Sequence, residues 1–381
     1  MRPATRATAV PALVVTAALA LSACGGSGSG SSSAKGAGAI TVKAGDSSCE
    51  VSRTDLEAGT HTFSITNTGS KTTEVYLYAP GDKIVAEKEN IAPGLAYELT
   101  AQVPQGSYEV ACKPGQTGKG IRTAVTVAAT TSAAPTDPAA AQAVTSYRTY
   151  VQQQADALVP LVVQLTDAVK AGDVAQARAL YAPSRVPWET VEPVAEAFGD
   201  LDPRMDIRKA DLEPGQDFTG WHRLEEALFT GAGSTAGLDG VADQLVTDVK
   251  DLQTRVAFAD LTTVSIANGA KELLDEVATG KITGEEEAFS HTDLVDFAAN
   301  VAGAEQAYTV LQPLVVKADA GLASTLDAAF AQVEAALKPY EVAGGGYVSY
   351  DTVTDDQRRE LARVVDGLGE PLSQLAATVA P

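Results

Sequence analysis

The sequence predicts two parts, an N-terminal all-β Greek-key sandwich followed by an all-α helical bundle. Residues 40–128 contain short segments in which polar and apolar side chains alternate, which is typical of half-buried strands. Residues 142–381 instead carry apolar side chains at spacings of three and four, which is typical of amphipathic helices. Residues 129–141 between them are small, polar and proline-containing, and we expect a linker there.

The clearest predicted strand covers residues 60–66, where Phe63 and Ile65 alternate with polar side chains before an Asn67-Thr68-Gly69 turn. Short strands separated by proline and glycine turns indicate a sandwich of about 90 residues. The further expected strands are residues 74–78, 83–86, 96–101, 107–111 and 124–127.

The clearest predicted helix follows Ser290, and its apolar face carries Leu294, Phe297, Val301, Ala304, Tyr308 and Leu311. Ser290 as N-cap and Asp293 three residues later match the pattern of a capping box. Residues 144–169, 241–264 and 322–337 show similar periodicity, so we expect one or two bundles.

The first 23 residues have the pattern of an export signal. Arg2 and Arg6 precede an apolar stretch, residues 10–21, that is too short to span a membrane. Leu21-Ser22-Ala23-Cys24 resembles a bacterial lipobox, which predicts lipidation of Cys24 and a flexible tether over residues 24–39. We therefore expect an extracytoplasmic, membrane-anchored lipoprotein; an ordinary signal peptide that happens to contain a cysteine is the alternative.

The remaining two cysteines, Cys49 and Cys112, would by default form a disulfide outside the cytoplasm, with a two-thiolate metal site as the alternative. The formal net charge is −21, and loss of residues 1–23 would make it −23. Such a surface disfavours nucleic acid and attracts cations, although acidity alone can also serve solubility.

His222 and Glu225 are the strongest candidates for chemistry. A His and a Glu three apart on a helix project from one face, and this pair could form half of a metal site. Glu189 and Glu192 repeat this spacing on a segment that could form a helix with Pro187 in its first turn. Two such pairs on facing helices would supply four inward ligands suited to iron or manganese, whereas each glutamate pair could also be a solvated helix face.

Other acids and histidines have plain alternative interpretations. Asp206 lies in a polar connection, and the run of residues 285–287 could be an acidic first turn. His291 is in register with the apolar face that begins at Leu294, so a buried structural histidine is favoured over a ligand. His61 lies in an alternating strand and is expected at the surface.

Two familiar metal chemistries do not match these residues. A zinc protease of the His-Glu-x-x-His type would need a second histidine near His222, and a blue-copper centre would need two histidines in the β part, which has only His61. Gly-x-Ser-x-Gly, the nucleophile elbow of many hydrolases, is missing as well.

Three ordered motifs carry a resemblance to a known family. Residues 184–193 (SRVPWETVEP), 218–225 (FTGWHRLE) and 290–300 (SHTDLVDFAAN) resemble the imelysin-like family, historically labelled peptidase family M75. Residues 49–50, 87–94 and 108–112 are similar to the cupredoxin-like domain that precedes it in iron-uptake members.

The resemblance implies an iron-binding function without catalysis. It places a metal site on His222, Glu225, Glu189, Glu192, Asp206 and one of residues 285–287, of which we select Glu286. It also implies a second site on Cys49, Glu74, Glu87 and Cys112, for copper or another divalent cation. The implied cargo is iron, Fe²⁺ or Fe³⁺, and the implied partners are an EfeU-type iron permease and an EfeB-type haem peroxidase. A metal-dependent peptidase-like hydrolase and a cation-bridged polysaccharide-binding protein remain the alternatives.

Overall fold

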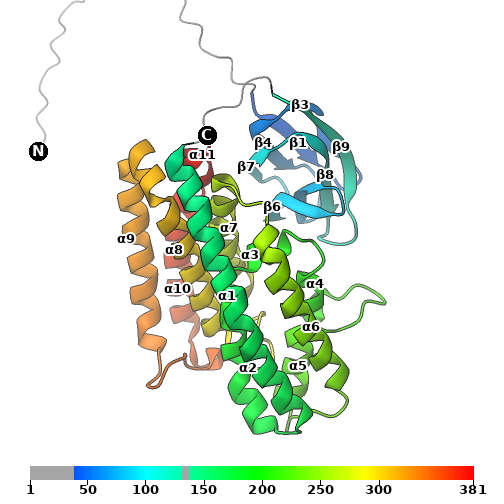
Figure 1. The fold of residues 1–381 in the computed structure, drawn as a ribbon, viewed down its shortest axis with the longest axis vertical. Coiled ribbons are helices and arrows are strands. Elements are labelled where there is room, and N and C mark those ends of the chain that lie inside the picture. Colours follow the sequence, from blue (N-terminus) through cyan, green and yellow to red (C-terminus); the bar gives the residue numbers. More distant parts are fainter. Residues whose placement is uncertain (1–37, 131–136) are drawn as a thin grey trace, which may run out of the picture. The chain divides into compact units, whose positions relative to one another are not determined.

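Nine strands form two sheets that pack into a sandwich, as the alternation of polar and apolar residues predicts (Figure 1). The computed structural model describes residues 38–130 and 137–381. The first sheet has the order β2 (Cys49–Val51), β1 (Ile40–Ala44), β4 (Gly59–Asn67), β7 (Ala96–Val103). The second has the order β3 (Asp55–Glu57), β9 (Ile121–Ala128), β8 (Gly106–Pro114), β5 (Thr73–Ala79), β6 (Lys83–Ile91).

The sandwich core is built from the inward-facing residue of each alternating pair, such as Phe63, Ile65, Val75 and Leu77. The strands predicted from residue 60 onward are all present, although most are longer than expected. The prediction missed β1, β2 and β3. Residues of β1 alternate in burial along Ile40–Ala44, so its pattern was readable, whereas β2 and β3 have three residues each and carry too little periodicity.

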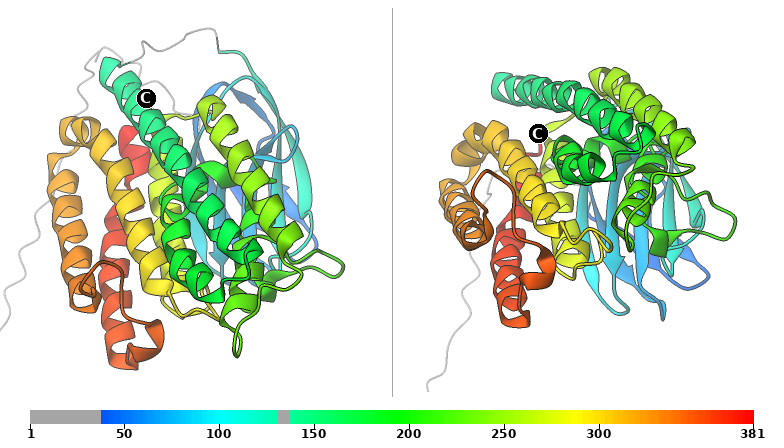
Figure 2. Two further views of the ribbon diagram at one scale, coloured as in Figure 1. Left: turned by 60° about the horizontal axis from the view of Figure 1, so that its bottom comes forward. Right: turned by 90° about the horizontal axis from the view of Figure 1, so that it is seen from below.

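The helical part begins with α1 and surrounds a second, larger core (Figure 2). Its longest helices, α1 and α8, pack against each other and against α2 and α7. Its main helices are α1 (Pro138–Lys170), α2 (Val174–Glu189), α5 (Gly220–Phe229), α6 (Asp239–Arg255), α7 (Thr263–Glu276), α8 (Asp293–Ala318), α9 (Ala320–Leu337) and α10 (Asp355–Leu372). Shorter elements are α3 (Glu192–Glu196), α4 (Asp202–Met205), α11 (Leu375–Val379), the π-helical turn η3 (Val277–Lys281) and 3₁₀ turns at Lys209–Asp211, Val256–Phe258, Lys338–Tyr340 and Tyr350–Thr352.

Three local predictions about helices are wrong. The periodic segment 241–264 is not one helix: α6 ends at Arg255, and α7 starts after an extended stretch with Thr262 as its N-cap. Ser290 does not cap α8, because the helix begins at Asp293, and the Ser290 hydroxyl donates to Glu287 instead. His291 is not buried, since its side chain is 39% exposed.

The predicted apolar face of α8 is confirmed, because all six of its listed residues are buried. Within the residues that the model describes, no helix is both long and apolar enough to cross a membrane. The predicted signal peptide, the lipidation site Cys24 and nearly all of the tether lie outside the described residues, as do residues 131–136 of the predicted linker.

Candidate metal centre

His222 and Glu225 lie on one face of α5 and are in contact, as their spacing predicted. His222 Nδ1 is 3.1 Å from Glu225 Oε2, and both side chains are buried. The other carboxylate oxygen, Oε1, accepts backbone N–H groups from Phe289 and Ser290, each at 2.8 Å. Both oxygens of Glu225 are thus engaged, and the arrangement resembles the carboxylate–histidine pairs that orient metal-binding imidazoles.

The second ring nitrogen of His222 faces two carboxylates from other segments. Nε2 lies 3.3 Å from Asp206 Oδ1 and 3.6 Å from Glu286 Oε1. Gly220 makes the approach of Asp206 possible: it has φ +70° at the start of α5, and a Cβ there would lie 1.9 Å from the Met205 carbonyl oxygen. Only glycine allows α4 and α5 to come this close.

We refer to Asp206, His222 and Glu286 as the histidine cluster. One ligand atom from each lies within 4.8 Å of the others, and all three residues are buried. His222 Nε2 has no hydrogen bond of acceptable geometry to any described residue. Ligand atoms around a six-coordinate ion with bonds near 2.1 Å lie about 3 Å apart, so these spacings fit one hard cation.

A buried arginine lies beside the histidine cluster. Arg185, on α2, is fully buried and its guanidinium forms ion pairs with carboxylates from α2, α8 and two connecting segments. The partners are Glu189, Asp206, Glu286, Glu287 and Asp296. The Trp188 indole N–H also donates to Asp206, at 2.7 Å. Arg185 therefore fixes the position of Asp206 without any metal.

Glu189 and Glu192 form a separate group with Glu276 around a buried lysine. Lys281 Nζ, at the end of the π-helical turn η3, is 3.2 Å from Glu189, 3.8 Å from Glu192 and 2.9 Å from Glu276. Gly303 of α8 leaves room for this junction, because a Cβ there would lie 2.5 Å from the Thr190 carbonyl oxygen. Asn300, one turn earlier, donates to Glu189.

The local charges move pKa values in opposite directions. Burial lowers the pKa of His222, but Asp206 and the hydrogen bond to Glu225 raise it well above its usual range. Burial raises the pKa of Asp206, but Arg185 and His222 bring it below its usual value. Burial raises the pKa of Glu189 to about 7 even though Lys281 opposes this. The carboxylates around His222 thus favour its protonated form, and a metal would have to displace that proton.

The structure brings together some of the predicted site residues and separates others. Asp206, His222 and Glu286 meet, with Glu225 behind the imidazole. Glu189 and Glu192 do not lie on one helix, because Glu189 ends α2 and Glu192 begins α3, and Pro187 lies inside α2. The expected arrangement of four ligands from two i, i+3 pairs is therefore wrong.

The implied second site in the β part is also wrong. Cys49 and Cys112 form a disulfide, the default expectation, so no thiolate pair is present. Val75 pairs with Cys112 across β5 and β8, which directs both side chains into the sandwich core. Glu74 is the next residue on β5 and faces the opposite side of the sheet, with Tyr76 and its cross-strand partner Glu87. The cysteines and glutamates are thus on opposite faces.

Sequence reasoning missed Arg185, Lys281 and Glu276. Arg185 lies four residues after Tyr181 and three before Trp188, both buried, so its place on an apolar helix face was a usable signal. Lys281 and Glu276 gave no such signal, because their positions depend on the π-helical turn.

Comparison with known proteins agrees with this architecture. The family model described as Imelysin (Peptidase M75) matches residues 143–375, and a cupredoxin-like domain model matches residues 11–127. A solved Parabacteroides distasonis structure named as an iron-regulated protein A precursor aligns with TM-score 0.51 at 15% identity, over 66% of this chain and 97% of its own, which shows a shared fold.

The chain therefore belongs to the imelysin (peptidase M75) family, with a cupredoxin-like domain at its N-terminus. Among named relatives it is similar to "Iron uptake system component EfeO" of Escherichia coli strain K12 and of Shigella flexneri. Each is 40% identical over 341 residues, covering 88% of this chain and 90% of the relative. These relatives are named as iron-uptake components, not as enzymes.

Proposed function

We propose that this chain is an extracytoplasmic, lipid-anchored iron-binding protein that captures iron at the histidine cluster and delivers it to an EfeU-type permease. An EfeB-type haem peroxidase would act in the same system. The relatives' names support a role in iron uptake. The anchor at Cys24 rests on the lipobox resemblance in the sequence.

One observation carries the metal-binding part of the proposal. His222 Nε2 is buried, lacks a hydrogen bond among the residues of the model, and faces Asp206 and Glu286 while Glu225 holds the opposite nitrogen. A buried ring nitrogen that makes no hydrogen bond of good geometry is costly, and an ion held with two carboxylates would remove that cost. One imidazole with carboxylate oxygens suits iron or manganese better than thiol-preferring metals.

The same geometry disfavours the peptidase alternative. A metal-dependent hydrolase needs an open water position and a free general base beside the metal. Glu225 has the spacing of such a base, but both of its oxygens are occupied by His222 and two backbone N–H groups. Binding without hydrolysis is the function that these contacts support best.

Anaerobic calorimetric titration with Fe(II) tests the proposal. His222→Ala should abolish one binding event, while the matched variant His61→Ala should bind like wild type, because the His61 ring bonds the Glu57 carbonyl oxygen on the sandwich. Circular dichroism would establish that both variants are folded. Unchanged Fe(II) binding in folded His222→Ala would refute the proposal.

A further inference from the structure

Three glutamates from both parts of the chain meet where the second sheet packs against the helices. Glu87 comes from β6, Glu196 from the last residue of α3, and Glu272 from the middle of α7. One oxygen of each lies within 4.8 Å of the others. We refer to these three residues as the interface carboxylates.

Hydrogen bonds join the strands to the helices near the interface carboxylates. Ile84 N–H of β6 donates to the Ala197 carbonyl oxygen, one residue after Glu196, at 3.1 Å. Asn268 of α7, one turn before Glu272, donates to the Thr100 carbonyl oxygen of β7 at 2.9 Å. The three carboxylates are thus brought together by specific contacts between strands and helices.

Glu87 is buried without a partner. It is 7% exposed and makes no hydrogen bond or ion pair with any residue in the described ranges, and the side chains of Glu196 and Glu272 make none either. The nearby lysines form no ion pair with them, since Lys88 and Lys271 both pair with Asp275. Burial, together with the neighbouring acids, raises the pKa of Glu87 well above its usual range and that of Glu272 to about 8.

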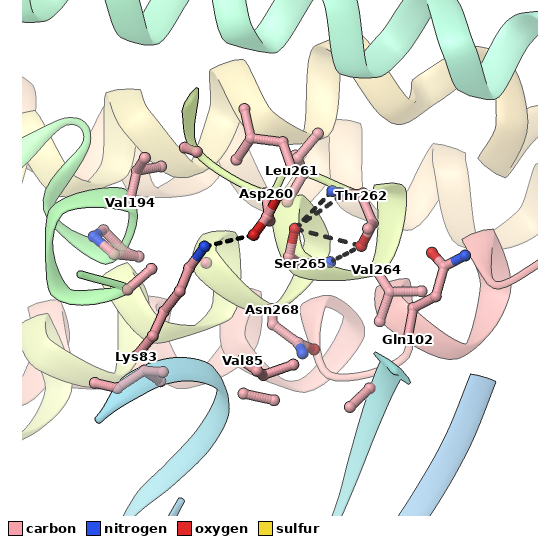
Figure 3. Close-up of a pocket in the computed structure, with 18 of the residues that line it drawn as sticks. Lys83, Val85, Gln102, Val194, Asp260, Leu261, Thr262, Val264, Ser265 and Asn268 are labelled. Carbon is pink, nitrogen blue, oxygen red and sulfur yellow. Dashed lines mark hydrogen bonds and ion pairs between the residues drawn. The ribbon is translucent and has the colours of Figure 1, made fainter. Parts of the chain in front are cut away.

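A cavity gives access to this point. It has a volume of about 340 Å³ and is lined by residues of β6 and β7 on one side and of α3 and α7 on the other, with Glu87 and Glu272 among them. Figure 3 shows Val85 and Gln102 from the strands facing Val194 and Asn268 from the helices across it. A second hollow is also lined by Glu87 and Glu272, together with Glu196.

We propose that Glu87, Glu196 and Glu272 form a second binding site, for a hard divalent cation such as Fe(II) or Mn(II), shared by the sandwich and the helical part. Carboxylate oxygens are the ligands such ions prefer, and three of them around one ion would remove the uncompensated charge. The inference rests on the proposed function in taking iron as the natural cargo.

The interface carboxylates connect to the histidine cluster through shared residues. Glu196 also groups with Glu192 and Asp202, and Glu192 groups in turn with Glu189 and Glu276. Glu192 Oε2 is buried and has no hydrogen bond among the described residues. Glu189 then contacts Arg185, which contacts Asp206. The interface carboxylates are therefore linked to the histidine cluster by a series of carboxylates that Arg185 interrupts between Glu189 and Asp206.

Titration of the full chain with Mn(II) alone, followed by electron paramagnetic resonance of the free ion, tests this site. Glu272→Gln, from the helical side, and Glu87→Gln, from the sandwich side, should each lose the same one of the bound equivalents that wild type shows. Glu57→Gln, on β3 of the same sheet and exposed, is the matched control and should bind like wild type.

The His222→Ala variant separates the two proposals. It should retain the equivalent that Glu272→Gln loses, and a variant carrying both changes should bind neither. If His222→Ala binds like wild type while Glu272→Gln loses an equivalent, the proposed interface site is supported and the proposed metal site at the histidine cluster is refuted. If folded Glu87→Gln and Glu272→Gln both bind Mn(II) with wild-type stoichiometry and affinity, the interface site is refuted.

Discussion

The histidine cluster is buried and the interface carboxylates are partly buried, and the two acidic groups are neutralised differently. Arg185 and Lys281 supply permanent positive charge beside the histidine cluster. The interface carboxylates form no ion pair with a lysine or arginine of the described residues, and burial raises the pKa values of Glu87 and Glu272 instead. The first group is therefore built to stay folded when empty, whereas the second depends on protons or on a bound ion.

Replacing Arg185 should cause the largest loss of stability, because Arg185 neutralises the carboxylates beside the histidine cluster. Arg185→Met would leave five buried carboxylates without their shared partner, and breaking a buried ion-pair network from one side costs about 3–5 kcal/mol. Urea denaturation of the metal-free protein would measure the loss. Arg363→Met, which removes only an exposed pair with Glu360, is the control and should not change the midpoint. An Arg185→Met midpoint equal to wild type would mean that the arginine does not compensate the cluster.

A smaller effect is expected from the residue behind the imidazole. Glu225→Gln keeps the size of the side chain but removes the charge that orients His222, and loss of such a partner lowers metal affinity about 10- to 100-fold. Fe(II) titration should therefore show a weakened event with unchanged stoichiometry. Complete loss of the event would instead make Glu225 a direct ligand.

The smallest effect concerns pH and the interface carboxylates. Glu272 has a pKa of about 8 in the folded protein against 4.5 ordinarily, so between these values the folded state holds a proton that the unfolded state has lost. Stability of metal-free protein should accordingly fall as pH rises from about 5 to about 8. Glu272→Gln should reduce that fall in urea midpoints measured across this range. Parallel pH profiles for variant and wild type would show that Glu272 does not hold the proton.

The sequence was sufficient where a feature depends on neighbouring residues. Alternation along residues 60–66 predicted β4, and the spacing of His222 and Glu225 predicted their contact on α5. The sequence was insufficient where the pairing register of the strands determines which side chains lie on the same face of the sheet. The family resemblance placed Cys112 and Glu74 in one site, but pairing of Val75 with Cys112 puts them on opposite faces of the sheet. The meeting of Glu87 with Glu272 depends on packing between segments 185 residues apart, which no local pattern encodes.

The permanent charge of Arg185 has a consequence for the proposed delivery of iron. Because that guanidinium holds the segments carrying Glu189, Asp206 and Glu286 whether or not iron is present, an empty copy keeps nearly the outline of a loaded one. If the chain delivers iron to a permease, as we propose, empty copies would compete with loaded copies for that permease. Under that competition, producing more of this protein without more iron would slow uptake.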